Sequence, residues 1–516
     1  MLLILKKSFN RRCPMFTPMT HRSLAYFTVL FIAVVFSGCV TQKDKAIAEG
    51  TAVLKKAEKV YAAYSVLAPS ATGTTILYAR VIVDGTNTHC PTLTSSAGVT
   101  IPTHPRGLHP DAGNATQNFP VTLCEAIISP DTAYTDLSGI VNLQAVTLSP
   151  SAVLVYGDSG CKSKKCKPGN PSKHFKKLAK VGIQEHPQLI LHMGDFNYRG
   201  TSGSIAKGVY AYDAGDGGFG GASCGFNSTY NSQNSSGSPR PDTWQYWYED
   251  FFLPAKDLLP IAPWIFARGN HELCSRAGVG WFYFLGPGSS LKGGIAQMQC
   301  PNQGCYSNPP ATPASHIIMI PPYAVELNDV RVWVMDSANA CDASAANPLT
   351  VQYQAQFEQL QTNSQGKNTW MMTHRPLWGI NSTAPGNAIN IMMQTALANT
   401  PMKSLPSSVS LSFSGHMHIY QSLDFPNNSA RPPQIIIGNS GVSLEKHGVV
   451  GDFSSVQVDG QNASGNGMNI YGFLSMKLQP NGTWTGDILD SSGKAFVTCG
   501  TQTLATNKSI CVLDQS

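Results

Sequence analysis

Charged side chains are scarce in this sequence, since Asp, Glu, Lys and Arg together make up 13% of its 516 residues. A coiled coil or a disordered acidic chain needs far more charge, so both classes are excluded. The chain instead contains 47 glycines and 34 prolines, which is typical of a loop-rich globular protein. Its length allows a large buried core and more than one structural unit.

An excess of positive charge is also missing from most of the chain. The formal net charge is +6, but five positive side chains lie in an N-terminal segment without acids that we expect to be removed. Subtracting them leaves a net charge of +1. A globally basic nucleic-acid-binding protein is therefore not indicated, and we expect no stable nucleic-acid partner. The five residues are Lys6, Lys7, Arg11, Arg12 and Arg22.

The apolar run near the N-terminus, residues 24–36, is too short for an ordinary membrane span, which needs about 20 residues. It follows a basic stretch and precedes polar residues, as in an export signal. The tetrapeptide FSGC that ends at Cys39 resembles a lipobox, although Phe36 stands where an aliphatic residue is usual. We expect residues 1–38 to be a signal peptide. Cys39 is then a lipid anchor, in an outer-membrane lipoprotein facing the periplasm or the cell surface; ordinary cleavage is the alternative.

Paired CxxC motifs are missing as well, which argues against a zinc ribbon. Eleven of the 13 cysteines remain when Cys13 and Cys39 are set aside. In an exported protein they predict disulfides, but spacing leaves the connectivity open and one thiol is left over. The locally close pairs are Cys90/Cys124, Cys161/Cys166, Cys300/Cys305 and Cys499/Cys511.

The pattern of apolar residues changes several times along the chain. Residues 39–72 have helical periodicity in part and predict a tether or helix. Residues 73–150 contain short β-like runs between Pro, Gly and Asn turns, which predicts a small β domain. Residues 151–445 alternate strand-length apolar runs with helix-like stretches, and residues 446–516 predict a β extension of this region. An α/β fold with mixed sheets follows from the alternation.

Five of the apolar runs in the central region end in short polar motifs. In α/β folds, ligands collect at the carboxyl ends of strands. Glycine allows close backbone approach, while Asn and His supply neutral ligands beside carboxylates. Each motif alone is more often a turn or a satisfied polar strand end, but five in order favour a metal site. The motifs are DSG at 158–160, GDFNY at 194–198, GNHE at 269–272, MMTH at 371–374 and GHMH at 415–418.

These motifs resemble the blocks of the calcineurin-like metallophosphoesterases, and within them the purple acid phosphatases, whose blocks run DxG, GDxxY, GNH(D/E), VxxH and GHxH. The resemblance covers about residues 151–441. Met371 replaces the usual valine, at a position expected to be a buried strand residue. The resemblance implies a sandwich of two mixed β-sheets flanked by helices and preceded by a small β domain, with residues 151–445 as the catalytic domain.

Gly160 stands where most calcineurin-like enzymes have a metal-binding histidine. In the purple acid phosphatases the tyrosine of GDxxY supplies the missing ligand, so the resemblance implies that Tyr198 binds the metal. A phenolate has an ordinary pKa of about 10, and only a strongly charged cation holds it deprotonated near neutrality, which favours ferric iron. The alternative is a tyrosine that only packs beside the strand end.

The resemblance further implies two metal ions, a ferric ion and a divalent ion of iron, zinc or manganese. His271 is implied to stabilise the transition state or protonate the leaving group, with Glu272 orienting it. A histidine that merely supports a neighbouring ligand is the alternative for His271. The implied ligands are Asp158, Asp195, Tyr198 and His418 on the ferric ion, and Asn270, His374 and His416 on the divalent ion, with Asp195 bridging.

The implied activity is hydrolysis of phosphate monoesters of small molecules by a metal-activated hydroxide, as in an acid phosphatase. A phosphodiesterase or nucleotidase on the same metal site is one alternative. A surface lipoprotein that keeps the fold without turnover is another, and it is disfavoured because all seven ligand positions are filled. The sequence leaves the oligomeric state open.

Overall fold

The structure is a computed structural model that describes residues 59–514 except for 87–88, 108, 112–117, 162–165, 167–168, 200–241, 275, 290, 292–294, 301–317, 343, 346–348, 382–388, 427, 429, 447, 481–482 and 502–509. These residues belong to the second of two units, Ala57–Ser516. The described residues include neither the expected signal peptide nor the anchor at Cys39, and they begin only at position 59 of the tether expected over 39–72. Within them, no helix is both long and apolar enough to cross a membrane.

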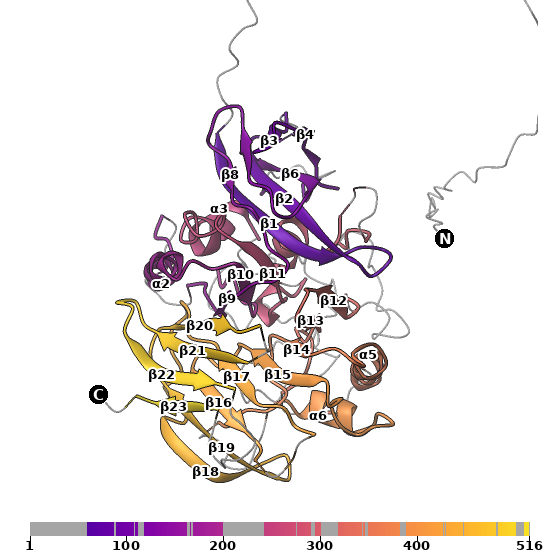
Figure 1. The fold of residues 1–516 in the computed structure, drawn as a ribbon, viewed down its shortest axis with the longest axis vertical. Helices are drawn as coiled ribbons and strands as arrows, with labels where there is room; N and C mark the ends of the chain where they lie inside the picture. Colours follow the sequence, from indigo (N-terminus) through magenta and orange to yellow (C-terminus); the bar gives the residue numbers. More distant parts are fainter. Residues whose placement is uncertain are drawn as a thin grey trace, which may run out of the picture. The chain divides into compact units, whose positions relative to one another are not determined.

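The larger of two main sheets contains strands from both ends of the described chain (Figure 1). Its strands are β1 (Val60–Pro69), β2 (Thr75–Asp84), β5 (His104–Pro105), β6 (Val121–Ile128), β9 (Ala152–Tyr156), β10 (Leu189–His192), β11 (Pro263–Phe266), β20 (Phe473–Leu478), β21 (Trp484–Leu489), β22 (Ala495–Gly500) and β23 (Cys511–Leu513). Their order is β23-β22-β21-β20-β9-β10-β11-β1-β2-β6-β5. The β9-β10-β11-β1 neighbours are parallel, so the sheet is mixed.

The second main sheet is also mixed, with β13, β14, β15 and β17 parallel. Its order is β12-β13-β14-β15-β17-β16-β19-β18. The strands are β12 (Tyr323–Glu326), β13 (Arg331–Val334), β14 (Thr369–Met372), β15 (Val409–Ser414), β16 (Tyr420–Asp424), β17 (Gln434–Ile437), β18 (Gly451–Val458) and β19 (Gln461–Met468). A small third sheet holds β3 (Thr92–Ser95), β4 (Thr100–Pro102), β7 (Tyr134–Asp136) and β8 (Asn142–Leu143).

Helices cover the outer faces of the two main sheets. The helical segments of the described residues are α2 (Lys173–Gln184), α3 (Trp244–Trp247), the π-helix η1 (Tyr248–Phe252), the 3-10 helix η2 (Asn270–Glu272), α4 (Gly278–Phe284), α5 (Leu349–Asn363) and α6 (Ile391–Ala398), of which η2 lies at the strand ends and not on an outer face. In α2 the buried residues Phe175, Leu178, Ala179 and Gly182 recur at helical spacing, so one face of the helix turns to the core. In Figure 1, α2 and α3 lie on one side of the fold, and α5 and α6 on the other.

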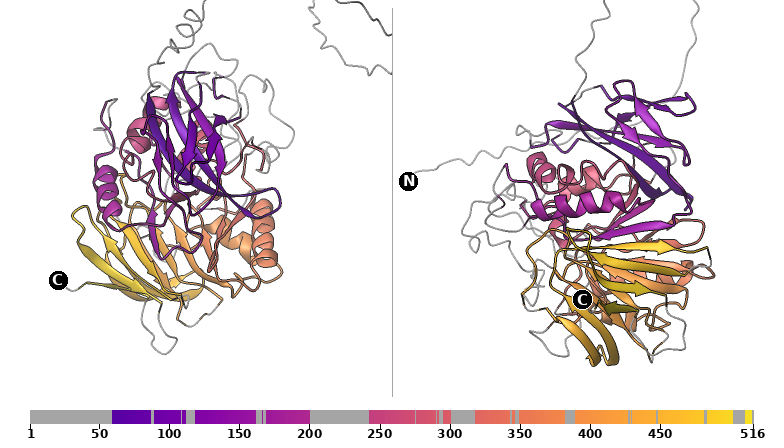
Figure 2. Two further views of the ribbon diagram at one scale, coloured as in Figure 1. Left: turned by 45° about the horizontal axis from the view of Figure 1, so that its top comes forward. Right: turned by 60° about the vertical axis from the view of Figure 1, so that its left-hand side comes forward.

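Alternating side chains in the central strands define the layers. In β9, Val155 belongs to the core between the sheets, while Leu154 packs with Phe175 of α2 on the outer face. In β14, Met372 belongs to the core between the sheets, while Met371 joins the cluster around α5 and α6. Successive side chains of a strand point to opposite faces, so each sheet is buried on both sides. The predicted sandwich of two mixed sheets flanked by helices is confirmed (Figure 2).

The strand-rich N-terminal region is present, but it begins earlier than predicted. Strand β1 starts at Val60, so the tether or helix expected over residues 39–72 is wrong from that position on. Tyr64 packs toward the helices and Leu67 toward the core between the sheets, so both faces of β1 are buried. A strand here pairs with both β11 and β2, which leaves neither edge of β1 open. These long-range pairings override the helical periodicity of the segment.

The segment 446–516, expected to extend the catalytic domain, divides between the two sheets. Strands β18 and β19 join the second sheet, and β20 pairs with β9 at the edge of the parallel part of the first.

Four disulfides join described cysteines. They are Cys90–Cys124, Cys161–Cys166, Cys274–Cys300 and Cys499–Cys511. The grouping of Cys300 with Cys305 by closeness in sequence is wrong, since Cys300 pairs with Cys274 at a Cα–Cα distance of 5.4 Å. Distance in space, which the sequence does not report, decides such pairings.

Candidate metal centre

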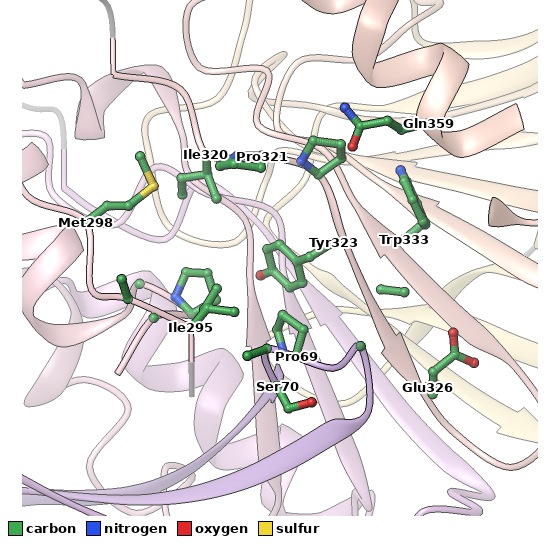
Figure 3. Close-up of a pocket in the computed structure, with 18 of the residues that line it drawn as sticks. Pro69, Ser70, Ile295, Met298, Ile320, Pro321, Tyr323, Glu326, Trp333 and Gln359 are labelled. Carbon is green, nitrogen blue, oxygen red and sulfur yellow. The ribbon is translucent and has the colours of Figure 1, made fainter. Parts of the chain in front are cut away.

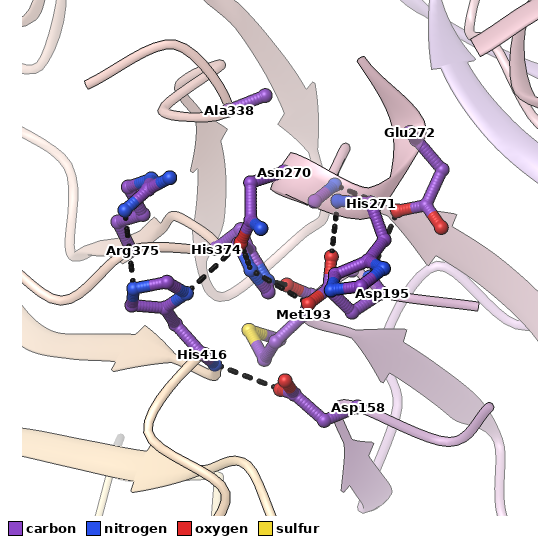
Figure 4. Close-up of polar contacts among 12 residues, drawn as sticks. Asp158, Met193, Asp195, Asn270, His271, Glu272, Ala338, His374, Arg375 and His416 are labelled. Carbon is purple, nitrogen blue, oxygen red and sulfur yellow. Dashed lines mark hydrogen bonds and ion pairs between the residues drawn. The ribbon is translucent and has the colours of Figure 1, made fainter. Parts of the chain in front are cut away.

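The seven predicted ligands all lie just beyond the carboxyl ends of five strands. Neighbouring parallel strands end at the same edge of a sheet, and the two sheets face each other, so the five strand ends meet (Figure 4). Asp158 follows β9, Asp195 and Tyr198 follow β10, Asn270 begins η2 after β11, His374 follows β14, and His416 and His418 follow β15.

One set of side chains converges on the hydroxyl oxygen of Tyr198, and we call it the Tyr198 group. The hydroxyl lies 2.8 Å from Asp158 Oδ1, 3.0 Å from Asp195 Oδ2 and 3.1 Å from His418 Nε2. His418 Nε2 is in turn 3.5 Å from Asp158 Oδ1. Three oxygen donors and one imidazole nitrogen therefore meet at one point.

A second set, which we call the His374 group, converges on the side-chain oxygen of Asn270. Asn270 Oδ1 lies 2.9 Å from His374 Nε2 and 2.9 Å from His416 Nδ1. His374 Nε2 is 3.4 Å from Asp195 Oδ2. The same Asp195 oxygen thus faces both groups, which is the arrangement that a bridging carboxylate requires. The structure brings all seven predicted residues together.

The missing side chain at Gly160 is linked to the position of the tyrosine ring. A Cβ atom at residue 160 would lie 2.7 Å from Cδ2 of Tyr198 and 2.6 Å from the carbonyl oxygen of Phe196. Both distances are too short for real contacts, so a larger residue at 160 and the present ring position exclude each other. The tyrosine occupies the space beside the first motif that the glycine leaves open.

Backbone strain is concentrated at this centre. Asp158, Asp195, His416 and His418 have φ angles of 55°, 59°, 72° and 52°, in the left-handed region that residues other than glycine rarely adopt. Such conformations cost about 1–3 kcal/mol each and persist only where the surroundings enforce them, most often at functional sites. Four strained residues that are also predicted ligands indicate a functional site.

Hydrogen bonds orient the two histidines of the His374 group. His374 Nδ1 lies 2.7 Å from the carbonyl oxygen of Met193, which can only accept, so Nδ1 carries a proton. Burial lowers the pKa of His374, but the Asp195 carboxylate outweighs burial and raises it to about 9, so without a metal Nε2 carries a proton as well and faces the oxygens of Asn270 and Asp195. A cation bound between these atoms would replace that proton on Nε2. The Nε2 atom of His416 lies 2.9 Å from the Asp342 carboxylate and donates to it, which leaves a lone pair on Nδ1. This lone pair lies on the side of Asn270 Oδ1, where a cation would be shared by both atoms. These are the tautomers that metal binding needs.

Asp342 is itself held by a buried cation. Arg375 donates to Asp342 Oδ2 over 2.5 Å. The same Nη1 atom lies 3.1 Å from His416 Nε2, and Figure 4 shows this second contact. Burial raises the pKa of the Asp342 carboxyl group, but the charge of Arg375 outweighs burial and holds this pKa well below its usual range. The carboxylate facing His416 is therefore ionised.

The side chains of the two groups are better suited to surround a cation than to face one another without one. Burial raises the pKa of Asp158 well above its usual value, and burial together with the Asp158 and Asp195 carboxylates raises that of Tyr198 well above 10. Buried carboxylates, imidazole lone pairs and an amide oxygen face one another, and a cation supplies the missing positive charge. Two sets with ligand atoms within 4.8 Å of one another could hold a metal: Asp158, Asp195 and His418, and Asp195, His374 and His416.

Glu272, expected to orient His271, binds the backbone of both loops around the centre. Its carboxylate accepts from the N–H groups of Gly269 and Asp195 on one oxygen, and from Phe196 and Asn197 on the other, over 2.8–3.1 Å. It thereby ties the loop after β10 to the loop after β11. This fixes Asp195 relative to Asn270.

His271 is only partly buried, unlike its neighbour Asn270. Its backbone N–H donates to Asp195 Oδ1 over 2.8 Å, and its ring centroid lies 3.9 Å from that of Tyr198. The side chain therefore lies beside the Tyr198 group. His192 is fully buried, and its Nε2 lies 2.9 Å from Ser159 Oγ.

Several residues that support the centre were missed by the sequence analysis. Arg375 directly follows a predicted ligand, and Asp342 lies in a loop beyond β13, where nothing in the sequence marks it. Glu249 and Asp250 form an acidic pair between apolar residues of a helix-like stretch, a pattern that could have drawn attention. Both acids are buried beside Arg199, which directly follows Tyr198.

A cavity of about 580 Å³ lies elsewhere in the described part of the chain (Figure 3). Its walls include Pro69, Ile320, Tyr323 and Trp333. None of the seven predicted ligands is among the described residues that line it. The clustered metal-binding side chains and this largely apolar cavity are separate features.

Comparison with known proteins gives one family match. The family model described as calcineurin-like phosphoesterase matches residues 152–420, a range that contains all five motifs. Among solved structures, a purple acid phosphatase from seeds of yellow lupin (Lupinus luteus) is 13% identical, with a TM-score of 0.47, covering 85% of this chain and 74% of its own. No curated protein matches the chain.

Proposed function

Because the chain belongs to the calcineurin-like phosphoesterase family, which makes it a metal-dependent phosphoester hydrolase, we propose that it is an acid phosphatase of the purple acid phosphatase type. Its substrates are phosphate monoesters of small molecules. The observation that carries the proposal is the position of Asp195 Oδ2, which faces both the Tyr198 group and the His374 group. A shared carboxylate oxygen is what a two-metal centre needs.

The proposed metals follow from the chemistry of the two groups. The Tyr198 group offers two carboxylates and a phenol, hard oxygen donors that suit ferric iron. The His374 group offers two neutral imidazoles and an amide oxygen, which suit divalent iron, zinc or manganese. When bound, such a pair lowers the pKa of water to supply hydroxide and stabilises the charge that develops on phosphorus.

His271 is proposed to protonate the leaving oxygen or to stabilise the transition state. Its backbone is fixed by Asp195, and its partly exposed ring lies beside Tyr198, where a substrate entering from solvent can meet it. The metal-binding side chains are held in place as well, because Glu272 joins the two loops that carry Asp195 and Asn270. The centre therefore needs little rearrangement to bind substrate.

Export and lipid anchoring at Cys39 complete the proposal. Disulfides form in oxidising compartments, and the export signal that we propose would deliver the protein to such a compartment, so the disulfides of the described residues agree with export. The enzyme then acts in the periplasm or at the cell surface, held to the outer membrane by lipid. Labelled fatty acid that enters the wild-type protein but not Cys39→Ala supports the anchor, and a protein without label contradicts it.

The activity is tested with an aryl phosphate monoester and the matching diester, over acidic to neutral pH. The expected result is monoester hydrolysis that is fastest in acid and is lost in Asn270→Ala, a variant that removes the central oxygen of the His374 group.

Two other outcomes contradict this assignment. Faster turnover of the diester identifies a phosphodiesterase or nucleotidase on the same site. No turnover of either ester after loading with iron and zinc identifies a protein that keeps the fold without the reaction.

A further inference from the structure

The segment that carries Tyr198 rests on a buried cluster of one arginine and two acidic residues. Arg199 contacts Glu249 through Nη1 and donates from Nε to Asp250 Oδ1 over 2.5 Å. The three side chains are 2%, 7% and 0% exposed. Arginine and acidic side chains are rarely buried to this degree unless they are paired, as these three are.

The two acids belong to the π-helix η1, Tyr248–Phe252. Consecutive residues of a helix normally point in different directions, yet both Glu249 and Asp250 reach one guanidinium group. A π-helical turn is uncommon and is frequently found at functional sites. The unusual turn is thus associated with the pairing of both acids with Arg199.

The same cluster holds the loop of the first motif. Glu249 Oε1 accepts from the N–H of Gly169 over 2.6 Å, and the Glu249 carbonyl accepts from Ser172 N over 3.0 Å. Ser172 Oγ in turn donates to the carbonyl oxygen of Ser159 over 2.9 Å. The π-helix is thereby connected to the residues that lie on either side of Ser159, namely Asp158 and Gly160.

Asp250 makes the most direct contact with the tyrosine. Its Oδ2 accepts from the backbone N–H of Tyr198 over 3.3 Å, and the backbone of Cys161 also hydrogen-bonds to its carboxylate. One side chain therefore contacts both the residue after Gly160 and the residue whose ring fills the space at Gly160. Its other oxygen is held by Arg199.

We propose that Asp250, held by Arg199, is a positioning residue that places the Tyr198 oxygen between Asp158, Asp195 and His418. This inference rests on the proposed function, in which that oxygen binds ferric iron. A ligand histidine at position 160 would be held by the end of β9, which directly precedes it. Tyr198 lies in the loop after β10 instead, so its backbone needs a separate contact to hold it. The charged cluster fixes it.

The test is a double-mutant cycle on the full-length protein with Asp250→Asn, Tyr198→Phe and both changes together. Ferric ion is added to metal-free protein, and the visible tyrosinate-to-iron band and the iron affinity in competition with a chelator are measured. Asp250→Asn is expected to weaken the band and lower the affinity about 10-fold, as the loss of a group that orients a ligand typically does. In the Tyr198→Phe background it is expected to add no further loss.

Asp242→Asn is a matched control. Asp242 is also a buried carboxylate, and it accepts from Trp247 Nε1 and Gly280 N over 2.9 and 2.8 Å. The control is expected to lower the melting temperature and leave the band unchanged. If Asp250→Asn does not fold, Arg199→Lys replaces it, because lysine keeps the charge but cannot bind both acids through a guanidinium fork.

The outcomes separate this inference from the proposed function. An unchanged band and affinity in the folded variant, or losses that add in the double mutant, overturn the role of Asp250 while the ferric centre stands. A wild-type protein that binds iron without the band overturns the bond between iron and Tyr198, and the inference with it.

Discussion

The two groups of the candidate metal centre are built and supported in different ways. The Tyr198 group presents carboxyl and phenol oxygens, and its Tyr198 and His418 are only partly buried. The His374 group presents neutral nitrogens and an amide oxygen, and His374, His416 and Asn270 are all buried. Hard anionic donors suit a highly charged ion and imidazoles suit a divalent one. The edge of the sandwich at which the five strands end thus carries two chemically distinct groups of side chains that share a single carboxylate.

The supporting contacts differ as well. In the His374 group, Met193 and Asp342 bind the imidazole rings themselves and so select the tautomers. In the Tyr198 group, Asp250 binds the backbone of the ligand residue. A histidine can be oriented through its second nitrogen, whereas a phenol has no second polar atom, so a tyrosine must be oriented through its backbone and its packing.

The largest effect is expected where the two groups meet. Asp195→Ala removes the shared carboxylate, so both sites should lose metal, and the rate should fall about 10³-fold, at the upper limit for the loss of one charge-stabilising group. Metal content and monoester turnover measure this. His416→Ala is the control, since it belongs to one group and should leave iron bound. Retention of both metals in Asp195→Ala would contradict the bridge.

Tyr198→Phe separates the two groups. The variant keeps the ring and loses the oxygen, so the coloured band should vanish. Iron affinity should fall about 100-fold, because losing a ligand costs at least as much as losing a residue that only orients one. Binding of a divalent ion to the His374 group should change little. Absorption spectra of the iron-loaded protein and a zinc titration measure the two effects. A band that survives in the variant would mean that another residue binds the iron.

Asp342→Asn is the converse change. The variant keeps the size of the side chain but loses the charge that fixes the tautomer of His416, so affinity for the divalent ion should fall about 10-fold. The tyrosinate band should remain. Isothermal titration with zinc, beside the visible spectrum, gives both readings. Loss of the band together with zinc affinity would show that the two groups are not supported independently.

The smallest effect on the site is expected from Gly160→Ala. The added methyl group meets the Tyr198 ring at 2.7 Å, so the ring must shift and the band should move in wavelength. Overpacking of this kind costs about 1–3 kcal/mol of stability, which a melting curve detects. Gly366→Ala is the contrasting control, because a Cβ there meets nothing within 4 Å and its cost comes only from placing alanine at a φ of 74°. A Gly160→Ala band at the wild-type wavelength would show that the tyrosine does not depend on this space.

The sequence indicated the site more completely than the fold around it. The five motifs predicted all seven positions that the structure brings together, because metal chemistry restricts the residue types and strand ends restrict their places. Their role as ligands stays a prediction. Strand β1 was missed, since its helical periodicity is local while its pairing with β11 and β2 is not. Cys300 was grouped with the wrong cysteine for the same reason.

The sequence by itself determined the donor types, their order along the chain and the absence of a side chain at Gly160. Only the tertiary structure decided which oxygen of Asp195 faces both groups, which nitrogen of each histidine is presented, and which buried charges hold Tyr198 and His416 in place. Those supporting residues, Asp250 and Asp342, come from elements distant in sequence. A buried charge is defined by what surrounds it, and the chain acquires those surroundings only when the two sheets pack together.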